Sequence, residues 1–145
     1  MIFAAGLGTR LRPLTDNMPK ALVPVAGKTM LERVILKLKD ASFHDITINI
    51  HHFGSQIIDF LRANQNFGVD IHISDERGEL LDTGGGIKKA RPLLESNEPF
   101  LIHNADILTD LDLNAFYHHH LESDADATPV SYTHLRAHET GRNLV

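Results

Sequence analysis

Hydrophobic and polar residues follow one another in blocks that predict alternating strands and helices. The apolar run at residues 1–6, MIFAAG, is typical of a buried strand that ends at a glycine. Residues 45–50 (DITINI) and 69–76 (VDIHISDE) are rich in β-branched side chains and predict two further strands. A fourth strand is predicted at residues 99–106, PFLIHNAD. A segment with helical features follows each of them along the chain.

The predicted helices differ in how they begin. Residues 55–65 have helical period, with Ser55 as the expected N-cap. Residues 83–96, TGGGIKKARPLLES, predict a loop that runs into a helix, and residues 112–123 predict the last helix. In residues 29–41, apolar side chains recur at the spacing of one helical face: Met30, Leu31, Val34, Ile35 and Leu38.

Four strand-then-helix units predict an α/β fold, namely a Rossmann-like, doubly wound and mostly parallel sheet. Ligands bind such sheets beyond the carboxyl ends of the strands. We therefore expect the ligand site near residues 4–8, 50–54, 74–76 and 104–106.

The composition narrows the classes of partner. With 42% hydrophobic and 23% charged residues, the 145-residue chain can build one compact core. The net charge of −5 argues against a nucleic-acid partner, because broad phosphate binding needs a positive surface. The sequence contains no cysteine, no signal-peptide pattern and no apolar run of transmembrane length. We therefore expect a cytoplasmic protein that binds a small ligand and no membrane.

The segment between the first strand and the first helix combines glycines with cations. It is about 20 residues long, whereas such connections usually have about 2 to 6. Gly6 and Gly8 allow backbone N–H groups to approach an anion, and Arg10, Arg12 and Lys20 bring positive charge to the same segment. The alternative is a solvated basic loop. The combined pattern favours a phosphate site.

Two phosphate-binding motifs are excluded by single positions. GLGTRL begins like the dinucleotide-binding fingerprint, but Leu11 stands where the third glycine is needed. GKT at residues 27–29 resembles the end of a P-loop, but Leu22 stands where its first glycine is needed. Neither a nicotinamide enzyme nor a P-loop NTPase is predicted.

The remaining motifs resemble those of sugar 1-phosphate nucleotidyltransferases, the nucleotide-sugar pyrophosphorylases. That family has G-x-G-T-R-x-x-P-x-T, then P-K and P-V-x-G-K, and this chain has GLGTRLRPLT, PK and PVAGK in the same order. The resemblance continues through TINIHHFGSQI, DTGGGI and HNAD to about Ala127. It is strongest to bacterial N-acetylmuramate 1-phosphate uridylyltransferases and mannose 1-phosphate guanylyltransferases.

The resemblance implies a reaction and its partners. A sugar 1-phosphate oxygen attacks the α-phosphorus of a nucleoside triphosphate, with UTP or GTP favoured, and pyrophosphate leaves. Mg²⁺ is the implied cofactor, since phosphoryl transfer depends on positioning and charge neutralisation. A non-catalytic module that binds a nucleotide or nucleotide sugar on the same fold is the alternative. The base, the sugar and the oligomeric state stay open.

The resemblance also implies roles for individual residues. Arg10, Lys20 and Asp106 are the expected catalytic residues, and Asp106 is the expected metal ligand, although a helix-capping or loop aspartate is the alternative. Asp82 either caps a helix or contacts the base. The expected nucleotide-binding residues are Ala5, Gly6, Gly8, Thr9, Arg10, Lys20, Gly84, Gly85 and Asn104. Gly84 and Gly85 are assigned to the base.

The end of the chain departs from the family pattern. Residues 130–140, VSYTHLRAHET, match the in-frame translation of a transposase sequencing adapter, and we interpret residues 130–145 as a non-native tail. Residues 1–129 are then the N-terminal, nucleotide-binding part of a nucleotidyltransferase domain truncated at its C-terminus. We expect this part to have little or no turnover and to expose apolar surface at the open sheet.

Overall fold

The computed structural model describes residues 1–130 of the chain, so the predicted tail lies outside the described residues except for Val130. Its main sheet has four strands in the order β5-β4-β1-β6, and every neighbouring pair is parallel. The strands are β1 (Ile2–Phe3), β4 (Asp45–Ile50), β5 (Asp70–Asp75) and β6 (His103–Asn104). The predicted α/β fold with a parallel sheet is confirmed.

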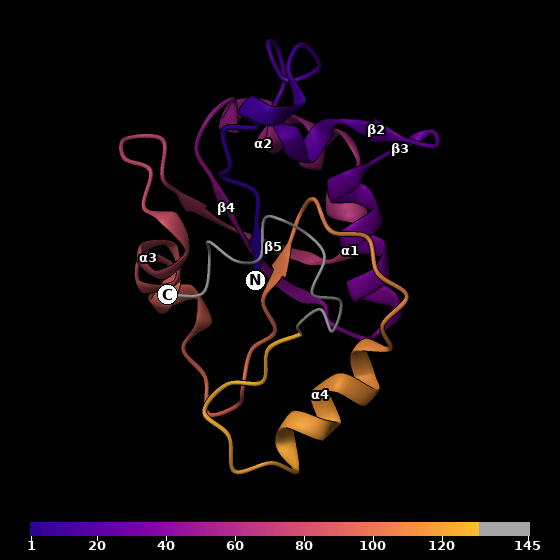
Figure 1. The fold of residues 1–145 in the computed structure, drawn as a ribbon, viewed down its shortest axis with the longest axis vertical. Helices are drawn as coiled ribbons and strands as arrows, with labels where there is room; N and C mark the ends of the chain where they lie inside the picture. Colours follow the sequence, from indigo (N-terminus) through magenta and orange to yellow (C-terminus); the bar gives the residue numbers. More distant parts are fainter. Residues whose placement is uncertain (131–145) are drawn as a thin grey trace.

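Three helices cover the faces of the sheet, namely α1 (Met30–Asp40), α2 (Gly54–Ala63) and α3 (Asp82–Leu94) (Figure 1). The last helix, α4 (Leu113–Leu121), lies beyond the sheet, at the opposite end of the molecule from the first loop. The Thr47 hydroxyl of β4 donates to the Leu93 carbonyl of α3 at 3.4 Å. The next residue of β4, Ile48, belongs to the apolar core that also contains buried residues of α1 and α2. Because successive side chains of a strand point to opposite faces, β4 is covered on both sides.

The core forms where the sequence places apolar residues at helical and strand spacing. The buried face of α1 consists of Leu31, Val34, Ile35 and Leu38, as predicted, whereas Met30, also predicted for this face, is only half-buried. Thr29 caps this helix, because its side-chain oxygen accepts a hydrogen bond from the Glu32 N–H at 3.1 Å. Because this face is buried in the core, α1 is held in a fixed position directly after the first loop.

The largest differences from the sequence prediction lie at the starts of α2 and α3 and in the lengths of β1 and β6. α2 begins at Gly54 after Phe53, whose φ of 54° is left-handed, so Ser55 is not the N-cap. α3 begins at Asp82, so the glycines that we expected in a loop lie in its first turn. β1 and β6 pair over two residues each, instead of spanning the predicted residues 1–6 and 99–106.

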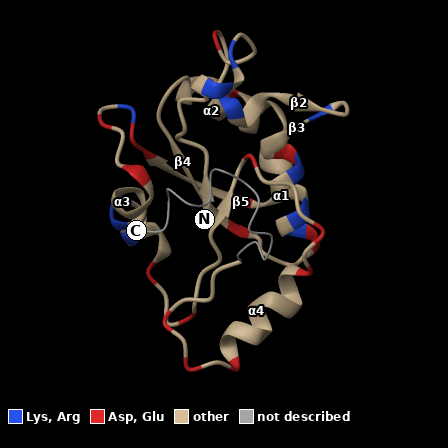
Figure 2. Cartoon of the chain, in the orientation of Figure 1, with Lys and Arg blue, Asp and Glu red and all other residues tan. Residues whose placement is uncertain are grey.

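The first loop is more structured than predicted. It contains two 3₁₀ turns, η1 (Thr9–Leu11) and η2 (Lys20–Leu22), and an antiparallel hairpin of β2 (Pro24–Val25) with β3 (Lys28–Thr29). Arg33 of α1 donates to the carbonyl oxygens of Val25 and Ala26 at 2.6 and 2.9 Å. Figure 2 shows positive charge in this loop at the top of the molecule. The hairpin therefore connects the loop to the rigid core through α1.

Apolar surface lies beside β6, at one edge of the sheet. A groove of about 1050 Å³ is lined largely by apolar side chains, among them Ile87, Leu94, Phe100, Ile102, Leu108 and Phe116. Phe100 and Leu108 are 45% and 52% exposed. The predicted exposure of apolar surface at the open sheet is thus present. None of the helices in the described part of the chain is long and apolar enough to cross a membrane.

Candidate nucleotide-binding cleft

A cleft of about 420 Å³ lies at the carboxyl ends of the strands. This is the edge at which ligands bind open parallel sheets. It brings together segments that are far apart in the sequence, namely the first loop, the start of α3 and the residues after β6. The predicted site residues that line it are Ala5, Gly6, Gly8, Thr9, Lys20, Asn104 and Asp106.

Gly8 and Thr15 fix the shape of the first loop. Gly8 has a φ of 66°, and a Cβ on it would lie 2.9 Å from Thr15 Cγ2 and 3.1 Å from Lys20 Cβ. Thr15 is buried, and its hydroxyl donates to the Gly8 carbonyl at 2.7 Å. Only glycine adopts this conformation readily at such a close approach. The sequence analysis assigned no role to Thr15, although this residue ends the GLGTRLRPLT motif.

The backbone of the first loop lines the cleft at Gly6, Leu7 and Gly8. Among the described residues, the N–H groups of Gly6, Leu7 and Gly8 donate to no backbone carbonyl. Gly6 and Leu7 are exposed, and all three residues line the cleft. Successive free N–H groups in a concave loop form an anion-binding site, because their partial positive charges add. The loop is therefore suited to hold phosphate oxygens.

Two alanine substitutions separate the shape of the loop from its binding capacity. Gly8→Ala should destabilise the fold by about 1–3 kcal/mol, because the methyl group meets Thr15 and the φ is positive. Gly6→Ala should change stability by less than about 0.5 kcal/mol, since no atom lies within 4 Å of a Cβ there. It should still weaken nucleotide binding, because the methyl group enters the cleft. Urea unfolding and nucleotide titration of both variants test this, and equal stability losses would contradict it.

Lys20 and Asp106 form an ion pair across the cleft. Lys20 Nζ donates to Asp106 Oδ2, and the two side chains are 33% and 34% exposed. The preceding Ala105 N–H donates to the Phe3 carbonyl at 2.9 Å, which fixes the Asp106 backbone beside β1. Burial lowers the pKa of nearby His103 below its usual value, which favours the neutral ring. Among the described residues that line the cleft, Lys20 is the cation that faces Asp106.

The metal-binding capacity of the cleft rests on Asp106. Glu76 and Asp82 also line it, but among the described residues no group of three metal-binding side chains is close enough to hold an ion. Magnesium often binds through one or two carboxylates together with substrate phosphates. The donor set therefore fits a magnesium ion only when phosphate oxygens complete the coordination.

Three predicted site residues do not line the cleft. Arg10 is exposed on η1, beside the lining residue Thr9, and Gly84 and Gly85 lie within the first turn of α3. Asp82 begins α3 with a φ of 53° and lines the cleft. No side-chain capping bond forms at this helix, so the capping interpretation of Asp82 is wrong.

A buried polar network lies beneath the cleft, and sequence reasoning missed it. Asn49 Oδ1 accepts a hydrogen bond from the Ala4 N–H at 2.8 Å, and Asn49 Nδ2 donates to Glu76 Oε1 at 2.9 Å. Glu76 is fully buried, and its Oε2 atom has no hydrogen-bond partner among the described residues. A Cβ on Gly86 would lie 3.0 Å from Glu76 Oε1, so α3 packs directly on this network. Polar and apolar residues alternate in DITINI, so Asn49 follows the pattern of a solvent-facing position, and residue spacing carried no signal of its burial.

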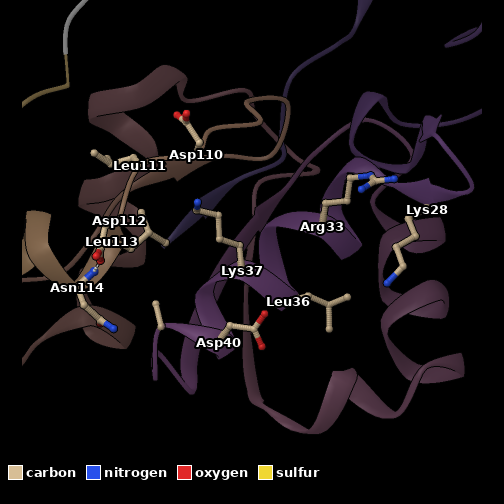
Figure 3. A pocket seen from close by; sticks show the side chains of 11 residues that line it. Lys28, Arg33, Leu36, Lys37, Asp40, Asp110, Leu111, Asp112, Leu113 and Asn114 are labelled. Carbon is tan, nitrogen blue, oxygen red and sulfur yellow. Dashed lines mark hydrogen bonds between the residues drawn. The ribbon is translucent and has the colours of Figure 1, made fainter.

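A second hollow lies between α1 and the segment before α4 (Figure 3). Its basic residues already have partners: Arg33 donates to Val25 and Ala26 carbonyls, Lys37 Nζ donates to the Thr109 carbonyl at 2.8 Å, and Lys28 pairs with Glu32. The hollow lies away from the carboxyl ends of the strands. It is a weaker candidate for an anion site than the cleft.

Comparison with known proteins identifies relatives of this chain. A family model described as "Nucleotidyl transferase" matches residues 1–141. An N-acetylmuramate alpha-1-phosphate uridylyltransferase from Neisseria meningitidis is 47% identical over 117 residues, which are 81% of this chain and 50% of that protein. A mannose-1-phosphate guanyltransferase from Gibberella zeae is 38% identical over 125 residues, which are 83% of this chain and 34% of that protein. The chain thus spans half or less of the length of these relatives.

The fold agrees with the same assignment. The structure of HddC from Yersinia pseudotuberculosis in complex with GMP-PN matches with a TM-score of 0.74 and 32% sequence identity, covering 85% of this chain and 54% of that chain. The resemblance detected in the sequence motifs is therefore confirmed by a family model, by relatives and by the fold. The chain belongs to the nucleotidyl transferase family.

Proposed function

We propose that the protein forms a nucleotide sugar and pyrophosphate from a nucleoside triphosphate, UTP or GTP, and a sugar 1-phosphate. One observation carries this proposal: the free N–H groups of Gly6 to Gly8, the Lys20 ammonium and the Asp106 carboxylate meet in a single cleft. Anion donors, a cation and a carboxylate are the groups that phosphoryl transfer requires. We propose that this activity is cytoplasmic.

The residues of the cleft would act mainly by positioning and by neutralising charge. The backbone of Ala5, Gly6, Gly8 and Thr9 would hold the triphosphate. Lys20 would stabilise the negative charge that builds on the α-phosphate as the sugar phosphate oxygen attacks it. Arg10, on η1 within the same loop, would contact the departing phosphates. No covalent bond to the protein is needed.

Asp106 would hold Mg²⁺ together with phosphate oxygens. The ion would supply additional charge neutralisation on the phosphates. Asn104 lies two residues earlier, in β6, and lines the same part of the cleft. We propose that its side chain contacts the bound nucleotide.

The base would lie at the start of α3, where Asp82 lines the cleft. The Asp82 carboxylate can accept a hydrogen bond from an N–H group, which both uracil and guanine carry. Gly84 and Gly85 remain our candidates for close backbone contact, although Leu80, Asp82 and Thr83 border the cleft in their place. A shift of the first turn of α3 on binding would bring the glycines nearer.

The second candidate function is nucleotide binding without catalysis. It is proposed for the 145-residue chain in isolation. The chain spans half the length of the Neisseria relative, yet its cleft combines a phosphate-binding loop with an ion-paired carboxylate. A half of this kind can bind a nucleotide without carrying an acceptor site. We therefore expect nucleotide binding by this chain and turnover only when a second half is present.

Nucleotide titration with a matched pair of arginine variants tests the proposed function. The chain should bind UTP or GTP, and Arg10→Ala should weaken this binding about tenfold, because a charge-assisted contact to phosphate is lost. Arg12→Ala should bind nearly as the parent does, since Arg12 pairs with Asp16 at 3.5 Å. Equal effects of the two variants would reject the role of Arg10, and failure to bind any nucleoside triphosphate would reject the site.

A chimera tests the reaction itself. The second half of the Neisseria uridylyltransferase, joined after the matched region, should restore pyrophosphate release with a sugar 1-phosphate and one nucleoside triphosphate. Release with no combination of the two substrates, from a folded chimera that binds nucleotide, would favour the binding module.

A further inference from the structure

Among the described residues that line the cleft, one ion pair is present, and it joins Lys20 to Asp106. The two residues are 86 positions apart in the sequence, so the tertiary structure alone brings them together. Both side chains are about one-third exposed. An exposed pair of this kind contributes little net stability and is easily exchanged for other partners.

The pair affects what Asp106 can bind. Because Lys20 donates to Asp106 Oδ2, a divalent cation that approaches this carboxylate meets an ammonium group. Repulsion between the two positive charges lowers the affinity for the metal. We propose that Lys20 serves as the counter-ion of Asp106 until a nucleotide binds, so that metal binding depends on prior withdrawal of Lys20. The inference rests on the proposed function, because it requires a nucleotide that attracts Lys20.

Lys20 is placed where it can exchange one partner for the other. Its Cβ lies 3.1 Å from the position of a Cβ on Gly8, beside the free N–H groups of the loop. The backbone is fixed by η2, where the Val23 N–H donates to the Lys20 carbonyl at 3.1 Å, while the four-carbon stem remains flexible. A triphosphate above those N–H groups carries several negative charges and competes effectively with a single carboxylate.

Once Lys20 moves to the phosphates, Asp106 becomes available to a metal. Glu76 cannot replace it, because Glu76 is buried and its Oε1 accepts from Asn49. The phosphates would supply the remaining oxygen ligands. Nucleotide and metal therefore assist each other, and by thermodynamic linkage each raises the affinity for the other by the same factor.

Mn²⁺ binding to the nucleotide-free chain tests this inference, with the EPR signal of free Mn²⁺ as the readout. Lys20→Met should bind Mn²⁺ about three- to tenfold more tightly than the parent, because the competing ammonium is removed. The same variant should bind UTP or GTP more weakly. These opposite changes are not expected if Lys20 only supports the fold or only contacts phosphate.

Three variants serve as controls. Lys20→Arg keeps the charge and should bind Mn²⁺ as the parent does. Lys28→Met removes a lysine that pairs with Glu32 at 3.4 Å outside the cleft, and should also leave Mn²⁺ binding unchanged. Asp106→Asn introduced into Lys20→Met should abolish the gain.

The outcomes separate the two proposals. Mn²⁺ affinity in Lys20→Met that equals or falls below that of the parent would overturn the counter-ion role. If neither UTP nor GTP binds to the parent, the proposed function fails, and the Mn²⁺ comparison still measures the influence of Lys20 on Asp106. A circular dichroism spectrum for each variant checks that the fold is retained.

Discussion

Asp106→Asn should lower the turnover of the chimera by about 100-fold or more, measured as pyrophosphate release. The amide keeps the shape of the side chain but loses the negative charge that would hold a metal ion beside the phosphates. Stability should hardly change, since the Lys20–Asp106 pair is partly exposed. Nucleotide binding without metal should be equal or tighter, because Lys20 no longer has a competing carboxylate.

Asp110→Asn is the matched control for this prediction. Asp110 is exposed four residues further along and does not line the cleft. Its variant should retain parental turnover. Near-parental pyrophosphate release by Asp106→Asn would show that Asp106 is not the metal ligand, and equal losses in both variants would indicate a general effect of charge.

Asn49→Ala should destabilise the chain by on the order of 3 kcal/mol, measured by urea unfolding. The substitution removes the acceptor of the Ala4 N–H and the donor to Glu76 Oε1, and it leaves both groups buried. A buried polar group without a partner costs its full desolvation penalty, and here two such groups arise together. The expected effect is therefore larger than that of an ordinary polar surface substitution.

The control is Asn114→Ala, at an exposed position of α4. Its unfolding midpoint should stay within the usual small range for surface changes, about 0.5 kcal/mol. If Asn49→Ala unfolds at the parental urea concentration, the network beneath the cleft does not hold the first loop in place. A lower midpoint together with weakened nucleotide binding would link the network to the position of Ala4 and Gly6.

Much of the fold could be predicted because its signals are local. The helical face of Leu31, Ile35 and Leu38 and the β-branched run at β4 both follow from residue spacing within a few turns or strand positions. The alternation of strands and helices then predicted a parallel sheet. The boundaries of the elements were harder to predict. Phe53 adopts a left-handed backbone conformation, so α2 begins at Gly54 and Ser55 is not its N-cap. Residue spacing does not reveal the backbone angle of a single residue.

Candidate site residues could be predicted in part. Gly6, Gly8, Lys20 and Asp106 belong to motifs that resemble the family, and the structure brings them into one cleft. Gly84 and Gly85 were also expected to contact the nucleotide. However, α3 begins at Asp82, two residues before Gly84, so both glycines lie in the first turn of the helix. Where a helix begins depends on packing against β4 and β5, which spacing alone does not specify.

The sequence by itself determined the alternation of elements, the apolar faces that form the core and the motifs that mark the family. Only the tertiary structure decided which charged and polar groups meet. Lys20 reaches Asp106 because β1 and β6 are neighbours in the sheet, and Asn49 reaches Ala4 because β4 pairs with β1. Periodicity and capping depend on residues a few positions apart, whereas these contacts depend on strand order and register, which bring distant residues together.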